Sequence, residues 1–391
     1  MSDAIARYIA ANPASAARTK RAAASLPGAN TRSVLHFDPF PLAFERAEGA
    51  YLYSLDGARY TDFLGEFTAG LYGHSHPVIL DAIRTALDRG LNYGGHSELE
   101  GQLAELLIAR FTAMELVRFT NSGTEANLMA LALALHHTGR TKILAFRGGY
   151  HGGVLAFGSG EPSPVTVPHA WVMGDFDAVE ATRALIREHE LAAILVEPMQ
   201  GSGGCLPASR AFLAMLREEA TRTGALLIFD EVMTSRLFPR AEPGFEGVVP
   251  DLMTVGKYLA GGMSFGAFGG RRDLMAAYDP TRPGALFHAG TFNNNVLSMS
   301  AGIAGLTHVL TDAALTDLNA RGDRLRTRLN EVVPTTGLGS LMTMHTDSQD
   351  LFFELIDAGY WIASRGMIAL SLAITDEQCD AFADTVAEIL C

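Results

Sequence analysis

The sequence contains no long hydrophobic run. Its longest uninterrupted apolar stretch is Leu128–Leu135, whereas a helix needs ~20 apolar residues to span a bilayer. The first residues mix charged and apolar side chains and lack the continuous apolar segment of a signal peptide. We therefore expect a cytoplasmic protein with no membrane partner.

Cysteine is scarce, and so is net positive charge. The three cysteines, Cys205, Cys379 and Cys391, are scattered without a CxxC pair, which argues against a disulfide framework and against a zinc site. The formal net charge is −13 at pH 7. A chain this acidic is poorly suited to neutralising phosphate backbones, so we expect no nucleic-acid partner.

Lysine is scarce as well, and it occurs only at Lys20, Lys142 and Lys257. Any chemistry that requires an amine nucleophile therefore has three candidates. Lys20 lies in a polar, alanine-rich segment, and Lys142 opens a strand-like run beside Arg140, where solvated lysines are common. Lys257 follows an apolar run, and because burying an unpaired ammonium group is costly, we expect it to have a function.

The middle of the chain alternates short apolar runs with amphipathic stretches. This pattern predicts parallel βαβ units with helices on both faces of one sheet. The expected strands are 116–120, 141–146, 192–198, 224–230 and 251–256, and Asp56-Gly57 marks a hairpin. We predict an α/β fold with a mostly parallel central sheet in a large domain, 47–295, and a smaller α+β domain, 296–391. An N-terminal helix and arm, 1–46, would join the small domain.

One familiar catalytic pattern is present but poorly placed. Gly262-Met263-Ser264-Phe265-Gly266 matches the nucleophile elbow of serine hydrolases. That elbow needs a strand directly before the serine and a helix directly after it, and neither is indicated here. A hydrolase that uses Ser264 is therefore kept only as a remote alternative.

A second pattern predicts a phosphate site. Ser122, Gly123 and Thr124 stand between a predicted strand and a predicted helix. A turn of this kind directs backbone N–H groups and two hydroxyls toward one spot at the positive end of the helix dipole. An ordinary helix N-cap would use the same residues, so the turn alone does not decide between the two.

Three further residues stand where predicted strands end. Asp230 ends one strand, Lys257 follows the next, and Tyr150 lies in a glycine-flanked loop after a third. Ligands of open parallel sheets bind outside the carboxyl ends of the strands. A phosphate cup, a carboxylate, an amine and an aromatic ring at one edge together describe a pyridoxal 5'-phosphate site. The lysine would form the Schiff base, and the carboxylate would keep the pyridine nitrogen protonated.

The sequence resembles the class III (ω-type) aminotransferases of fold type I. The likeness runs from about Leu26 to the C-terminus and rests on the segments NSGTEAN, GGYHGG, VEPMQG, IFDEVMTS, VGKYLAGG and HAGTFNNN. The resemblance implies a homodimer with shared active sites, in which Thr291 reaches the phosphate bound by the neighbouring subunit. It implies the following cofactor contacts: Ser122, Gly123 and Thr124 at the phosphate, Tyr150 and Val232 on the two ring faces, Glu197 and Asp230 at the ring nitrogen, and Lys257 as the catalytic lysine.

Within this class the chain looks most like the aromatic β-amino acid (β-phenylalanine) aminotransferases. That likeness rests on Arg32 in PGANTR together with Arg365 in IASRGMIALSL. It implies that Arg32 binds the carboxylate shared by amino donor and keto acid, and that Arg365 engages the second carboxylate of a 2-oxoglutarate-type acceptor. A fixed guanidinium fork suits both tasks. Pyruvate as the acceptor stays open.

Two other readings within the class also stay open. One is an amino shift like that of glutamate-1-semialdehyde 2,1-aminomutase, and the other is an ω-amine:pyruvate aminotransferase. The chain departs from its apparent relatives at Ala289, where a serine is often found, and in a short segment at 346–351. In every one of these readings the partners are a small amino donor, a keto acid and a second copy of the chain.

Overall fold

The computed structural model describes residues 2–239, 245–346, 348 and 350–390. Positions 347 and 349 of the short segment 346–351 lie outside the described residues. The chain divides into two compact units. The terminal unit comprises Met1–His76 and Leu318–Cys391, and the central unit comprises Pro77–Asp317. No helix in the described ranges is long and apolar enough to cross a membrane.

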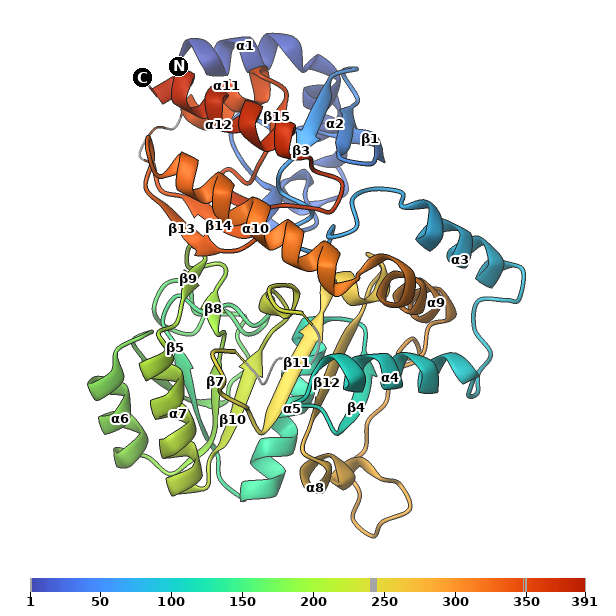
Figure 1. Cartoon of the computed structure of the whole chain (residues 1–391), viewed down its shortest axis with the longest axis vertical. Helices are drawn as coiled ribbons and strands as arrows, with labels where there is room; N and C mark the ends of the chain where they lie inside the picture. Colours follow the sequence, from blue (N-terminus) through green and yellow to red (C-terminus); the bar gives the residue numbers. More distant parts are fainter. Residues whose placement is uncertain (1, 240–244, 347, 349, 391) are drawn as a thin grey trace. The chain divides into compact units, whose positions relative to one another are not determined.

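The central unit is built on a seven-stranded sheet with the order β4-β12-β11-β10-β7-β5-β6 (Figure 1). Its strands pair in parallel, except that β12 runs antiparallel to both of its neighbours. The strands are β4 Leu116–Thr120, β5 Lys142–Phe146, β6 Ala170–Gly174, β7 Leu191–Val196, β10 Leu226–Asp230, β11 Leu252–Gly256 and β12 Gly266–Gly270. The prediction of a mostly parallel α/β sheet is therefore confirmed.

Two strands of this sheet, β6 and β12, are not suggested by the sequence. Three of the five residues of β12 are glycine, which is unfavourable in a strand. A side chain at two of these glycines would clash with the neighbouring backbone. A Cβ on Gly266 would lie 2.1 Å from the carbonyl oxygen of Ser122, and one on Gly270 would lie 2.2 Å from that of Asp251. The segment pairs with β11 and β4 on its two sides, and glycine is needed at these two positions because the neighbouring backbone leaves no room for a side chain.

Helices of the central unit begin and end at residues that favour helix termini. Helix α5 begins after the N-cap Ser122 and ends at Gly139, which adopts the left-handed conformation. Helix α7 is bounded in the same way by Ser209 and Gly224. The helices are α3 Pro77–Leu87, α4 Glu98–Arg110, α5 Gly123–Thr138, α6 Val179–Glu188, α7 Arg210–Thr223, α8 Arg272–Met275 and α9 Val296–Ala304.

The buried face of α5 packs on the middle of the sheet. Leu131, Leu133 and Ala134 of this helix belong to one fully buried cluster with Ile228 of β10 and Phe268 of β12. Burial of apolar side chains contributes roughly 1.5–3 kcal/mol per large side chain. This packing fixes the N-terminus of α5 against the ends of the strands.

The terminal unit joins both ends of the chain through sheet pairing. Residues Tyr360–Trp361 of β15 pair in parallel with β3, so that residues of the predicted large domain lie in the terminal unit. The observed limits, His76 and Asp317, therefore differ from the predicted 46 and 295. The strands are β1 Phe44–Glu48, β2 Tyr51–Ser54, β3 Arg59–Asp62, β13 Thr335–Leu338, β14 Leu341–Met344, β15 Tyr360–Trp361 and β16 Met367–Ala369.

Proline divides the predicted N-terminal helix into two. Helix α1 ends at Ala11, and α2 begins at Pro13, which occupies the first helical position. The other helices that lie wholly or partly in this unit are α10 Asp312–Leu329, α11 Asp350–Asp357 and α12 Asp376–Leu390. Short elements complete the chain: β8 Met199–Gln200, β9 Leu206–Pro207, the 3₁₀ turns Pro27–Ala29, Ser33–Leu35, Thr234–Arg236, Lys257–Ala260 and Ala276–Tyr278, and a π-helical turn Gly305–Val309.

Candidate active site

Asp230 and Lys257 open onto the same edge of the central sheet. Asp230 is the last residue of β10, and its partner in the parallel register is Thr254 of β11. Lys257 follows the end of β11 directly. Because neighbouring parallel strands end at the same edge, the carboxylate and the amine lie at one rim, as the sequence predicts.

The N-terminus of α5 lies against this rim. A Cβ on Gly256, the residue before Lys257, would lie 3.6 Å from the amide nitrogen of Gly123. The Ser122 hydroxyl accepts a hydrogen bond from the amide of Glu125 at 3.2 Å. The amides of Gly123 and Thr124 come earlier in the helix, where no intrahelical acceptor exists. They remain suited to an anion such as a phosphate group.

Two close contacts place the loops that carry Tyr150 and Val232 against this helix. A Cβ on Gly123 would meet the Val232 side chain at 2.8 Å, and a Cβ on Gly152 would overlap the Thr124 hydroxyl. Glycine is required at both positions for this packing. As a result, the turns that follow β5 and β10 both touch the first turn of α5.

Asp230 is held by a network that sequence reasoning missed. Its carboxylate accepts hydrogen bonds from the Val232 amide at 3.1 Å and from the Asn127 side-chain amide at 2.7 Å. The His151 Nδ1 atom lies 2.8 Å from the same carboxylate. Asn127 is positioned in turn by Thr254, whose hydroxyl donates to its side-chain oxygen at 2.7 Å. One indication of this network is present in the sequence, which is that His151 directly follows the predicted site residue Tyr150.

Glu197 lies close enough to Asp230 for electrostatic repulsion between the two carboxylates. The Glu197 carboxylate is buried and accepts hydrogen bonds from the amides of Tyr150 at 2.8 Å and Gly201 at 3.1 Å. Burial raises the pKa of Glu197 to about 7, His151 opposes that rise, and the Asp230 charge adds to it. Two buried acids therefore lie near each other at this rim.

Lys257 is partly buried and has an unusual environment. Loss of contact with water lowers the pKa of its amine to about 8, although attraction to Asp230 and Glu197 opposes this shift. Its backbone φ is 55°, a left-handed value that is uncommon for a residue with a side chain. Such conformations cluster at functional sites. The amine is thus easier to deprotonate than an ordinary lysine.

Tyr150 and Thr291 are both exposed in this chain. The Tyr150 residue is 49% exposed although it lies in the loop that follows a buried strand. Thr291 lies in the turn before α9, and Asn293 of that turn accepts a hydrogen bond from Asn121 at 3.0 Å. The turn that carries Thr291 is therefore tied to the residue before Ser122.

The two predicted substrate arginines meet within the terminal unit. The Arg32 guanidinium carbon lies 6.0 Å from the centre of the Phe67 ring, and that of Arg365 lies 5.6 Å from it. Arg32 also pairs with Glu66 at 2.8 Å. The two cations are far apart in the sequence, yet both lie close to the same aromatic ring.

Ser264 lacks the surroundings of a hydrolase nucleophile. It follows the 3₁₀ turn Lys257–Ala260, and strand β12 comes after it. A nucleophile elbow has the opposite arrangement, with a strand before the serine and a helix after it. The geometry therefore gives the serine hydrolase alternative no support.

Comparisons with known proteins identify the family. The profile of the family "Aminotransferase class-III" matches residues 35–163 and 169–390. A β-phenylalanine transaminase from Variovorax paradoxus is 50% identical over 100% of this chain and 95% of the relative. A crystal structure of a β-phenylalanine aminotransferase from that organism has a TM-score of 0.96 and covers 99% of this chain and 96% of its own.

Two other relatives represent the alternatives within the class. A glutamate-1-semialdehyde 2,1-aminomutase from Bordetella avium is 38% identical over 82% of this chain and 79% of the relative. An ω-transaminase from Sphaerobacter thermophilus is 34% identical, with a TM-score of 0.90 over 96% of this chain and 97% of its own.

The fold and this set of groups define a fold type I, pyridoxal phosphate-dependent transferase. The chain belongs to the class III aminotransferases and is a transaminase. The groups at the sheet edge fit the cofactor chemically. Helix N-terminal amides suit its phosphate, a buried carboxylate suits a protonated pyridine nitrogen, and an amine of lowered pKa suits its aldehyde.

Proposed function

We propose that this transaminase moves the amino group of an aromatic β-amino acid, of the 3-amino-3-phenylpropanoate type, to 2-oxoglutarate or pyruvate. The observation that carries the proposal is the convergence of Arg32 and Arg365 on the Phe67 ring. Two guanidinium groups suit a dicarboxylate, and an aromatic ring near both of them suits an aromatic side chain. The 50% identity to a β-phenylalanine transaminase supports the same substrate class.

The central unit would hold the cofactor through the groups at the sheet edge. Pyridoxal phosphate supplies an electron sink for the charge that forms when the amine-bearing carbon loses a proton. Asp230, with Glu197 nearby, would stabilise positive charge on the ring nitrogen. The other contacts are Ser122, Gly123 and Thr124 at the phosphate, and Tyr150 and Val232 on the two faces of the ring.

Lys257 would anchor the cofactor and move the proton. Its Nζ atom can accept a proton from the amine-bearing carbon only when it is uncharged. The lowered pKa of about 8 keeps part of the amine uncharged near neutral pH, which is the condition for a general base. The reaction would be ping-pong, since the first keto acid leaves before the second enters.

The terminal unit would recognise the substrate. Arg32 would bind the carboxylate common to donor and acceptor, and Arg365 would bind the second carboxylate of 2-oxoglutarate. A cavity of about 340 Å³ in this unit is lined by Arg32 and by five aromatic residues: Phe37, Phe44, Phe67, Phe352 and Trp361. Its volume falls in the range of small-molecule sites, and its apolar lining favours an aromatic donor.

We also propose that the enzyme is a homodimer in which Thr291 contacts the cofactor phosphate of the neighbouring subunit. Phe287 and Phe292 flank Thr291 and are 87% and 54% exposed. Leu91 and Tyr93 are also large exposed apolar residues of this unit. Exposed apolar side chains of this size mark interaction surfaces when they cluster. Sedimentation should show a dimer, and Phe287→Asp should weaken it.

The substrate assignment is tested by incubating the holoenzyme with 3-amino-3-phenylpropanoate and 2-oxoglutarate. Glutamate should form, and initial rates at several fixed acceptor concentrations should give parallel double-reciprocal lines. Separate incubations with glutamate-1-semialdehyde alone and with 1-phenylethylamine plus pyruvate test the two alternatives. Faster turnover in either of these would replace the β-amino acid assignment.

The two arginines should differ in their effects. Arg32→Ala should weaken both half-reactions, by roughly 10–100-fold in kcat/KM, because each loses a charge-assisted hydrogen bond. Arg365→Ala should weaken mainly the half-reaction with 2-oxoglutarate. Arg46→Ala is the control, since Arg46 pairs with Glu48 on the surface of the same unit. Equal loss in both half-reactions of Arg365→Ala would contradict this division.

A further inference from the structure

A strained turn lies beside Arg32 in the terminal unit. Gly65, Glu66, Phe67 and Thr68 have φ values of 53°, 47°, 50° and 82°. Three of these four are not glycine, and the left-handed region is unfavourable for each residue that has a side chain. The sequence offers no asparagine or second glycine at these positions to reduce the cost.

The surrounding structure holds this turn in place. The Asp62 carboxylate accepts hydrogen bonds from the amides of Leu64 at 2.9 Å and Gly65 at 3.0 Å. A Cβ on Gly65 would lie 2.8 Å from the carbonyl oxygen of Ala369, and Thr68 is buried. Strain that is enforced in this way clusters at binding sites and switch regions.

The turn presents two side chains to the predicted substrate arginines. Glu66 directs its carboxylate to the Arg32 guanidinium at 2.8 Å. The next residue, Phe67, places its ring near the guanidinium groups of both Arg32 and Arg365. The Arg32 and Glu66 side chains are 48% and 55% exposed. The Arg32 guanidinium therefore remains accessible to an incoming anion, and the Glu66 carboxylate has access to water.

We propose that Glu66 is an internal competitor that occupies Arg32 until a substrate carboxylate displaces it. This inference rests on the proposed role of Arg32 as the carboxylate anchor. The exchange makes and breaks no covalent bond. One carboxylate replaces another on the guanidinium, and the freed Glu66 carboxylate turns to water. Donor and acceptor both carry a carboxylate, so Glu66 lowers the affinity for both, whereas an amine without a carboxylate leaves the Arg32–Glu66 pair intact.

The expected effect of this competition is modest. Half-exposed ion pairs shift an equilibrium by about one- to fivefold. Removal of the competing charge should therefore tighten binding of a carboxylate ligand by about two- to fivefold. Added salt should reduce this gain, because it screens exposed charges.

The test uses the holoenzyme, its Glu66→Gln variant and 3-phenylpropanoate, an unreactive carboxylate. Its Kd is measured by the change in cofactor absorbance, and KM is measured for 3-amino-3-phenylpropanoate, 2-oxoglutarate and 1-phenylethylamine. We expect a lower Kd, a lower KM for both carboxylate substrates, a smaller change in kcat, and no change in KM for 1-phenylethylamine. Glu66→Asp, whose carboxylate is one methylene shorter, should behave like Glu66→Gln.

Two controls separate this proposal from the proposed function. Glu48→Gln removes the carboxylate of another surface pair, Arg46–Glu48 at 3.5 Å, and should leave every value unchanged. If Arg32→Ala weakens 3-phenylpropanoate binding but Glu66→Gln leaves it unchanged or weakens it, Glu66 is no competitor and the role of Arg32 stands. If Arg32→Ala has no effect on carboxylate binding, the substrate assignment itself fails.

Discussion

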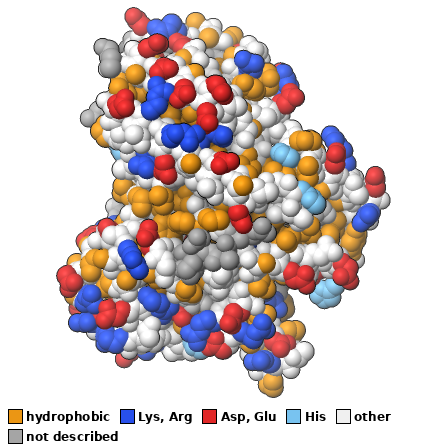
Figure 2. Space-filling model, in the orientation of Figure 1, with side chains coloured by type: hydrophobic (Ala, Val, Ile, Leu, Met, Phe, Trp, Pro, Cys, Tyr) orange, Lys and Arg blue, Asp and Glu red, His pale blue; other side chains and the backbone are white. Residues whose placement is uncertain are grey.

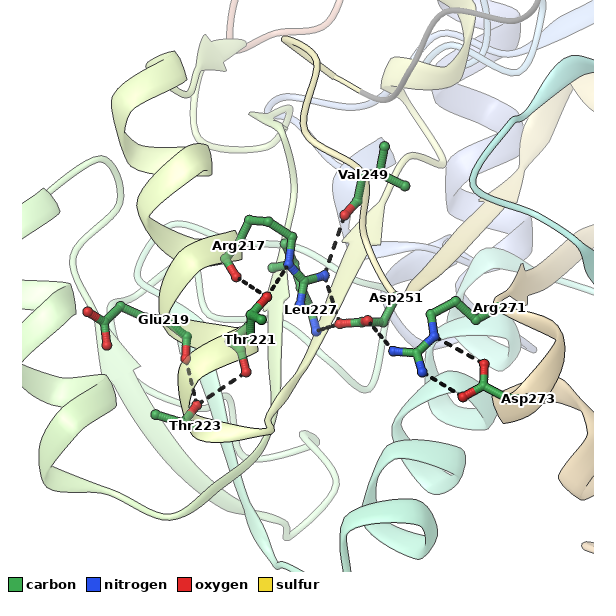
Figure 3. A network of polar contacts seen from close by, with 10 residues as sticks. Arg217, Glu219, Thr221, Thr223, Leu227, Val249, Asp251, Arg271 and Asp273 are labelled. Atoms are coloured by element: carbon green, nitrogen blue, oxygen red, sulfur yellow. Dashed lines mark hydrogen bonds and ion pairs between the residues drawn. The ribbon is translucent and has the colours of Figure 1, made fainter.

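Two buried aspartates at opposite edges of the central sheet show how differently one fold treats a carboxylate. Asp251 stands just before β11, and Asp230 ends the neighbouring strand β10. Figure 3 shows Asp251 between Arg217 and Arg271, which pair with it at 2.8 and 2.9 Å. The amide of Leu227 donates a third hydrogen bond at 2.8 Å. The charge of Asp251 is therefore compensated within the protein.

Asp230 is held in another way. Its hydrogen-bond partners are a backbone amide, the Asn127 side-chain amide and the His151 imidazole, and its attraction to Lys257 acts at the same rim. These contacts fix the position of the carboxylate, and within the described part of the chain no arginine pairs with Asp230 as two arginines do with Asp251. A carboxylate held in this way can serve a cationic ligand group.

Two buried glutamates repeat the contrast. Glu219 of α7 is hydrogen-bonded most strongly by Arg187 and also by Arg222 and Arg183, and these contacts lower its pKa to about 2. In Figure 2 acidic and basic side chains alternate over the face of α6 and α7. Glu197 at the candidate site has backbone amides as partners, and burial raises its pKa to about 7. Asp251 and Glu219 are thus paired with arginines, whereas Asp230 and Glu197 are held by amides and, for Asp230, by His151.

The largest effect is expected at the amine. Lys257→Ala should lower transamination by at least about a thousandfold, because both the covalent anchor and the proton carrier are lost. The visible absorbance band of the holoenzyme should shift or disappear. Lys142→Ala serves as the control, because Lys142 is exposed and stands at the start of β5, away from the strand ends that carry the candidate site. Normal multiple turnover by Lys257→Ala would show that the active site does not lie at this edge of the sheet.

Asp230→Asn should have the next largest effect on catalysis. Asparagine preserves the size of the side chain and can still accept the Val232 amide, but the negative charge is lost. We expect kcat to fall by about 100-fold, since a fixed charge aimed at the reacting group contributes about this much. The melting temperature of the apoenzyme should change little. A stable variant with kcat within threefold of the native value would show that the charge is not used.

The same substitution at Asp251 should reduce stability and leave catalysis nearly unchanged. Asp251→Asn removes the partner of two arginines and should lower the free energy of unfolding by about 2 kcal/mol, less than the 3–5 kcal/mol of a fully buried pair because both arginines are partly exposed. Denaturant titration measures this loss. We expect kcat to stay within about twofold, and a large loss of kcat without a loss of stability would break the comparison of the two edges.

Much of the fold was predictable because local sequence and burial agree. The runs 116–120 and 251–256 are rich in apolar or β-branched residues, and both form strands close to the expected ends. Strand β12 could not be predicted, since its glycines are needed only because Ser122 and Asp251 approach it. The domain limits depend on the pairing of β15 with β3, a contact between distant parts of the chain.

The sequence allowed the prediction of site residues that stand at strand ends. It did not allow the prediction of residues that hold another site residue in position. Asp230 and Lys257 follow apolar runs, and their places could be inferred from strand ends. Asn127 lies in the first turns of α5, and its contact with Asp230 joins two elements that the sequence cannot align. The left-handed conformation of Glu66 was equally hidden, because nothing in its residue type indicates a positive φ.

The smallest expected effect concerns pH and separates a site lysine from a solvated one. Only the uncharged amine attacks an aldehyde, so the rate at which the apoenzyme recovers its absorbance with pyridoxal 5'-phosphate should follow the deprotonated fraction of Lys257. With a pKa of about 8, that fraction rises about tenfold between pH 7 and pH 9 and then levels off, whereas a lysine near pKa 10.4 would still gain about tenfold per pH unit at pH 9. The recovery rate should therefore be half-maximal near pH 8, because loss of water around the amine disfavours its charged form. A rate that continues to rise steeply above pH 9 would mean that this lysine titrates like one in water, and the contrast between the two edges would then rest on the carboxylates alone.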